Sequence, residues 1–161
     1  MTLKEIRERD HARLETVCPP LREVVRSILT AMDVLGFPMT VTAAARTPEE
    51  QFALWCKGRK MQGSLWVPID PVRFTGIVTW ADGIVKKSNH QVAADGLGRA
   101  IDAAFLVDGP DADDIPDTPS WDEKHPWELY GEMGKALGHG RVEWGGDWKK
   151  PHDAPHLGWR D

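Results

Sequence analysis

A histidine and an aspartate lie on either side of a glycine-rich segment near the middle of the chain. They are His90 and Asp102, and Asp102 falls inside the apolar run 100–107. A carboxylate in such a run costs free energy unless it is paired or binds a metal ion. One interpretation is an ion pair with an arginine such as Arg99. The other is half of a zinc site, because catalytic zinc needs three protein ligands and an open position for water.

The C-terminal segment offers candidates for the third ligand and for a base. His152, Asp153 and His156 lie within five residues of each other. The proline before His156 disfavours a helix, but a turn there could bring Asp153 and His156 to one site. His156 would then be a ligand, and Asp153 would be the base. A carboxylate is a weak base, but it suffices here because zinc lowers the pKa of its bound water. The alternatives are His152 as ligand, Asp147 as base, or a solvated charged loop without a site.

Three blocks of sequence resemble the family of zinc D-Ala-D-Ala carboxypeptidases and L-alanyl-D-glutamate endopeptidases, which includes phage endolysins. They occur in the family's order, and two features depart from its pattern. The gap between His90 and Asp102 is longer than in the tightest form of the motif, and the base position, often glutamate, holds Asp153. The blocks are Ala45-Arg-Thr-Pro-Glu-Glu-Gln51, Ser88-Asn-His90 with Gly98-Arg-Ala-Ile-Asp102, and Trp144-Gly-Gly-Asp-Trp148 with Asp153-Ala-Pro-His156.

The resemblance implies a zinc centre with His90, Asp102 and His156 as its three ligands. It also implies that Asp153 is the general base that activates the water and then the acid that protonates the leaving amine. The cofactor expected from the resemblance is therefore Zn²⁺.

The resemblance assigns supporting roles to three more residues. Arg46 would steady the scissile carbonyl as it becomes an oxyanion, since fixed positive charge aimed at developing negative charge is a large term in catalysis. Gln51 lies five residues further along and would be a supporting group rather than a catalyst. Ser88 would orient the His90 loop by hydrogen bonding.

The elements that must hold these residues suggest an α+β fold. We expect a small antiparallel sheet with flanking helices, and the resemblance implies the hedgehog-like fold of the zinc D-Ala-D-Ala peptidases. The pattern predicts helices at 1–17, 21–35, 47–58 and 121–137, strands at 39–43 and 100–107, an irregular cleft wall at 59–78 and a surface loop at 108–119. We expect residues 1–161 to form one domain, with the helices of 1–36 packed on it and no separate wall-binding domain.

Composition excludes some classes of protein. The 161 residues are 41% hydrophobic and carry a net charge of −5, which argues against a general nucleic-acid binder. No apolar run approaches the ~20 residues that span a bilayer, and the N-terminus lacks the pattern of a signal peptide. We expect a monomer with no nucleic-acid or membrane partner, located in the cytoplasm of a bacterial host and reaching the cell wall after membrane breach.

The sequence thus predicts a zinc-dependent hydrolase whose partner is a peptidoglycan stem peptide, as in a phage endolysin. The bond would be L-Ala–D-Glu, cut by an endopeptidase, or D-Ala–D-Ala, cut by a carboxypeptidase. Two other hypotheses stay open. One is a catalytically inactive zinc-holding binding module of the same fold. The other is a structural phage component whose tryptophans bind glycan.

Overall fold

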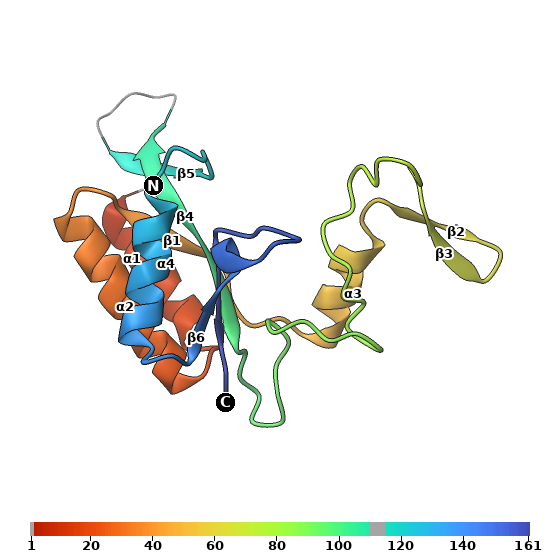
Figure 1. Ribbon diagram of the computed structural model, residues 1–161, viewed down its shortest axis with the longest axis horizontal. Coiled ribbons are helices and arrows are strands. Elements are labelled where there is room, and N and C mark those ends of the chain that lie inside the picture. Colours follow the sequence, from red (N-terminus) through yellow and green to blue (C-terminus); the bar gives the residue numbers. More distant parts are fainter. Residues whose placement is uncertain (1, 110–114) are drawn as a thin grey trace.

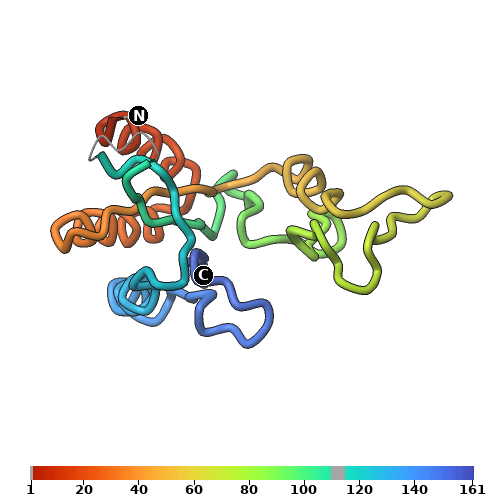
Figure 2. The backbone as a smooth tube through the Cα atoms, turned by 90° about the horizontal axis from the view of Figure 1, so that it is seen from above, coloured from red at the N-terminus to blue at the C-terminus, as the bar shows by residue number. Residues whose placement is uncertain are grey.

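The computed structural model describes residues 2–109 and 115–161, which form a body around one β-sheet and an arm that projects from it (Figure 1). The arm, residues 47–87, carries the helix and hairpin that lie apart from the rest in both views (Figures 1 and 2). The helices are α1 (Leu3–Leu14), α2 (Pro19–Val34), α3 (Pro48–Cys56), α4 (Trp127–Leu137) and the 3-10 helix η1 (Gly145–Asp147). The strands are β1 (Met39–Ala43), β2 (Arg59–Gln62), β3 (Leu65–Pro68), β4 (Ala100–Asp108), β5 (Pro116–Ser120), β6 (Val142–Trp144) and β7 (His156–Trp159).

The body sheet has the order β1-β4-β7-β6, with β5 also paired to β4, and its pairings are antiparallel. The predicted α+β architecture with a small antiparallel sheet is therefore confirmed. The apolar run 100–107 forms the central strand β4. Because side chains alternate along a strand, Ile101 and Ala103 enter the core while Asp102 between them points to the other face.

Helices α2 and α4 cover the core face of the sheet. The apolar residues of α2 recur at spacings of three and four and are buried, as the periodicity predicts. Full burial of one such side chain stabilises the fold by about 1.5–3 kcal/mol. No helix in the described ranges is long and apolar enough to cross a membrane.

Helix α1 packs on the edge of the sheet through a buried carboxylate. Asp10 accepts hydrogen bonds from Thr40 Oγ1 at 2.6 Å and from the Val41 amide at 3.1 Å, and its other oxygen pairs with Arg7. This contact ties the N-terminal helix to β1, the strand that leads directly into the site.

Three predicted boundaries were wrong. The irregular wall at 59–78 contains the β2–β3 hairpin, because Gly63 takes the positive φ that a tight turn needs. The last residues of the predicted loop 108–119 belong to strand β5 (Pro116–Ser120), which pairs with β4, while residues 110–114 lie outside the described residues. Helix α4 begins at Trp127 rather than at residue 121, since Pro126 disfavours helical backbone in the residue before it.

Gly131 lets α4 lie directly against the indole ring of Trp144. A Cβ at this position would lie 2.1 Å from Trp144 Cδ2. We expect Gly131→Ala to lower the free energy of unfolding by roughly 1–3 kcal/mol through overpacking, although alanine favours helices over glycine. Urea denaturation checks this. The control Glu132→Ala removes only an exposed ion pair with Lys135 and should be nearly neutral. Equal stability of the two variants would contradict the close contact.

Candidate metal centre

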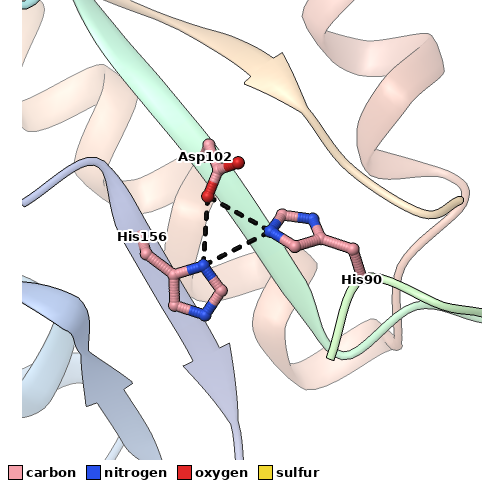
Figure 3. A group of neighbouring side chains, drawn as sticks. All are labelled: His90, Asp102 and His156. Atoms are coloured by element: carbon pink, nitrogen blue, oxygen red, sulfur yellow. Dashed lines mark hydrogen bonds and ion pairs between the residues drawn. The ribbon is translucent and has the colours of Figure 1, made fainter. Parts of the chain in front are cut away.

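Three side chains from separate parts of the chain meet on the open face of the sheet (Figure 3). Asp102 Oδ1 lies 3.1 Å from His90 Nε2 and 3.0 Å from His156 Nδ1, and the two nitrogens are 3.3 Å apart. The histidines are almost fully buried, while the Asp102 side chain is 23% exposed. The structure therefore brings together the three residues that the sequence indicates as ligands.

The sheet register places two of these residues opposite each other. Asp102 of β4 pairs directly with His156 of β7, and on its other side with Ala43 of β1. His90 comes from the loop before β4, which is attached to the end of β1: the Arg46 amide donates to the His90 carbonyl, and the Val92 amide donates to that of Arg46. Backbone pairing alone thus fixes all three positions.

The hydrogen bond on the far side of His90 determines what its inner nitrogen can do. Nδ1 lies 2.9 Å from the carbonyl of Ala44, which can only accept, so Nδ1 carries a hydrogen. In the neutral ring Nε2 then carries a lone pair and no hydrogen, and this atom faces the Asp102 carboxylate and His156. The three facing atoms need either a hydrogen on His156 Nδ1, which would donate to the other two, or a metal ion held among them. A histidine with its outer nitrogen bonded to a carbonyl is the usual arrangement of a metal ligand.

The spacing of the three atoms suits a tetrahedral ion. Ligand bonds of 2.0–2.1 Å around tetrahedral zinc separate neighbouring ligand atoms by about 3.3 Å, against 3.0–3.3 Å observed here. His156 Nε2 is buried and has no hydrogen-bond partner among the described residues. It is the ring nitrogen opposite Nδ1, so the fit to a metal ion rests on the three facing atoms and their spacing. The residues present therefore fit a divalent metal ion.

Arg46 and Gln51 lie directly behind Asp102. Arg46 Nη2 is 3.3 Å from Asp102 Oδ2, and Arg46 Nη1 is 3.4 Å from Gln51 Oε1. Asp102 does form the ion pair with an arginine that the alternative interpretation expected, but its partner is Arg46 and not Arg99, which binds Asp95 and Asp161 at the surface. Burial alone would raise the pKa of Asp102, but bonding to His156 and His90 holds that pKa well below its ordinary value.

Asp153 lies beside the cluster, and its carboxylate has no hydrogen-bond or ion-pair partner within the described part of the chain. Its backbone joins η1 to β7, since its amide donates to Gly145 and its carbonyl accepts from His156. A Cβ on Gly145 would lie 2.3 Å from the Asp153 carbonyl, so only glycine permits this approach. Burial is the main cause that raises the pKa of Asp153, and the negative charge of Asp102 raises it further. A raised pKa suits a general base.

The rival candidates lie away from the cluster. His152 is exposed and is not part of the ligand group. Asp147 is also exposed and pairs with Lys135 at 2.9 Å. Ser88 Oγ accepts a hydrogen bond of 3.3 Å from the His90 amide, which places it behind the ligand loop.

Sequence reasoning missed several contacts that hold the site. Gln91 is buried and joins the Ser88 amide to the Gly83 carbonyl, so it fastens the His90 loop to the arm. The Tyr130 hydroxyl donates to the Pro155 carbonyl and supports the turn before His156. The Trp148 ring lies 4.9 Å from that of His156. Only the position of Gln91 beside His90 offered a signal in the sequence.

Comparison with known proteins shows the family. No family model matches the chain. Over 140 residues it is 30% identical to the peptidoglycan L-alanyl-D-glutamate endopeptidase CwlK of Bacillus subtilis, covering 86% of this chain and 71% of that protein. The chain belongs to the family of peptidoglycan L-alanyl-D-glutamate endopeptidases. The fold of this chain also resembles the crystal structure of the Serratia marcescens L-Ala D-Glu endopeptidase ChiX, with TM-score 0.52, 23% identity and coverage of 94% of this chain and 86% of that one.

The geometry predicts that the protein binds one divalent ion and is stabilised by it. Adding zinc to chelator-treated protein should raise the melting temperature, because a ligand that binds only the folded state stabilises it by mass action. His156→Ala should abolish both the shift and the bound metal measured by elemental analysis. The matched control is His152→Ala, which removes an exposed histidine four residues away and should keep both. Metal retained in His156→Ala, or lost in His152→Ala, would contradict the ligand set.

Proposed function

We propose that this chain is a zinc-dependent endopeptidase that cuts the L-Ala–D-Glu bond of peptidoglycan stem peptides. The observation that carries the proposal is the His90–Asp102–His156 cluster, whose facing atoms have the spacing of tetrahedral ligands, with the unpartnered carboxylate of Asp153 beside it. The names of the relatives CwlK and ChiX support the bond and the substrate.

Asp153 and Arg46 have different roles in the proposed peptide hydrolysis. A zinc ion bound at the cluster would lower the pKa of water to about 7 and polarise a carbonyl group. The Asp153 carboxylate takes the proton from the attacking water and then gives it to the leaving amine. The raised pKa of Asp153 suits it to hold that proton between the two steps. Arg46 keeps positive charge beside Asp102, where it faces the charge that develops on the carbonyl oxygen.

Two finer parts of the predicted function are the bond that is cut and the route by which the enzyme reaches the cell wall. Cleavage of D-Ala–D-Ala is the alternative bond, and neither relative is named for it. We also propose that the enzyme acts on the cell wall as a phage endolysin does, after the membrane is breached. Lysis of cells that express the protein only when their membrane is permeabilised would support this route, and lysis without permeabilisation would contradict it.

The second candidate is an inactive zinc-holding module of the same fold. Such a module needs the three ligands but has no use for a free carboxylate or an arginine beside them. Asp153 and Arg46 both lie next to the cluster, so activity is the better hypothesis. Zinc binding without cleavage of any stem peptide would favour the module.

Replacing the base should separate catalysis from metal binding. Asp153→Asn should lower kcat by roughly 10²–10⁴-fold, the usual contribution of general acid–base catalysis, while the zinc content stays unchanged. Mass spectrometry of the products from purified muropeptides measures the rate and identifies the bond. The control Asp147→Asn changes an exposed carboxylate and should leave kcat unaltered. Full activity of Asp153→Asn, or its loss together with zinc, would contradict the role of Asp153.

Arg46 should act on the transition state rather than on metal binding. We expect Arg46→Met to lower kcat by roughly 10²-fold, the loss seen when one stabilising donor of an oxyanion is removed, with little change in zinc content. Arg99→Met is the comparison, since Arg99 was the rival partner of Asp102 but binds surface carboxylates. Steady-state kinetics on the same muropeptide measure both. Equal losses in the two variants would show that Arg46 has no special role.

A further inference from the structure

The arm presents an exposed tryptophan in a fixed position. Trp80 is 54% exposed, and its ring meets that of Phe74 at 5.4 Å with an interplanar angle of 74°. Its exposure by itself does not mark a site, since Trp121 is 55% exposed as well, but Trp80 is also held by the contacts described next. The metal centre does not use Trp80, so its position needs another explanation.

A buried arginine supports the ring of Trp80. Arg59 is only 7% exposed, and its guanidinium lies 4.4 Å from the ring centre of Trp55 and 5.2 Å from that of Trp80. Arg59 also donates to the Thr79 carbonyl at 3.1 Å. Cation–π contact of this kind holds an aromatic ring in one orientation. One side of the indole is therefore covered, and about half of its surface remains available to a ligand.

The residues on both sides of Trp80 are linked to the metal centre through hydrogen bonds of Gln51. The buried Gln51 side chain donates to Thr79 Oγ1 at 3.3 Å and to the Ala81 carbonyl at 2.8 Å. Its oxygen accepts from Arg46, which in turn contacts Asp102. Three successive polar contacts thus connect a candidate metal ligand to the residue next to Trp80. Trp80 is thereby held on the same polar network as the candidate metal ligand Asp102.

We infer that Trp80 is a substrate-binding residue that stacks on a sugar ring of the peptidoglycan glycan. This rests on the proposed function, because the L-alanine of the stem is the amino acid joined to the glycan, so a sugar lies close to the L-Ala–D-Glu bond wherever the stem is still attached to the glycan. The C–H groups on one face of a pyranose ring are weakly positive and apolar. They match the negative face of an indole ring.

The inference predicts a selective defect for two substrates that share one scissile bond. One is the free stem peptide, and the other is the same stem attached to its disaccharide. Trp80→Ala should raise KM for the disaccharide-linked stem by roughly three- to tenfold, the range expected for loss of one aromatic stacking contact. The values of kcat and KM for the free stem should not change. Trp80→Phe keeps a flat ring and should recover most of the loss.

The matched control is Phe37→Ala. Phe37 is a 42% exposed aromatic residue that lies in the body between α2 and β1. It should leave both substrates unaffected. Equal defects on both substrates in Trp80→Ala would mean that Trp80 binds the peptide or only supports the arm. No defect on either would mean that it binds no substrate, and both results would overturn the inference.

Failure of the inference and failure of the proposed function give different results. If the wild-type protein cuts neither substrate when loaded with zinc, the proposed function itself is wrong. If the wild-type protein cuts both substrates, and Trp80→Ala changes the two KM values to the same degree, the endopeptidase activity is supported and the sugar contact is wrong. Zinc content measured for each variant shows whether the body of the protein is intact.

Discussion

The carboxylate of Asp102 lies on the central strand of the sheet, largely out of water, where an unpaired negative charge would be strongly destabilising. Its partners come from three directions: His156 from the neighbouring strand, His90 from the preceding loop and Arg46 from the end of β1. Each partner must be held in place by backbone, and the β1–β4–β7 pairing does this. The sheet and the candidate metal centre therefore depend on the same contacts.

The surroundings of the site shift the pKa values of two carboxylates in opposite directions. Asp102 is bonded to both histidines, so its pKa lies well below the ordinary value. Asp153 is partly buried near the same charge but without a bonding partner in the described chain, so its pKa is raised. A pair of acids with pKa values moved apart in this way can serve as metal ligand and proton carrier, respectively. The glycines before Asp153 permit this arrangement by letting its backbone approach η1.

The arm is connected to the site through the buried side-chain amide of Gln51. Gln51 carries hydrogen bonds to the Arg46 side chain and to the backbone around Trp80, so the arm and the body share a polar network. Gln91 adds a second link, from the His90 loop to Gly83 of the arm. Networks whose members are all bonded in a low-dielectric interior are stiff. These links fix the part of the arm around Gln51 and Gly83 relative to the cluster.

Local chemistry in the sequence determined the helix α2, the capping box at the start of α3 and the apolar central strand, because periodicity and caps act over a few residues. Residue types and their spacing also indicated His90, Asp102 and His156. The meeting of these three depends on tertiary structure, since 66 residues separate the two histidines and only strand register brings them within 3.3 Å. The tautomer of His90 likewise follows from the Ala44 carbonyl, 46 residues away. Contacts between distant backbone segments leave no local pattern. The motif blocks therefore indicated Arg46, Gln51 and Ser88, whereas the links through Gln91 and Tyr130 were visible only in the fold.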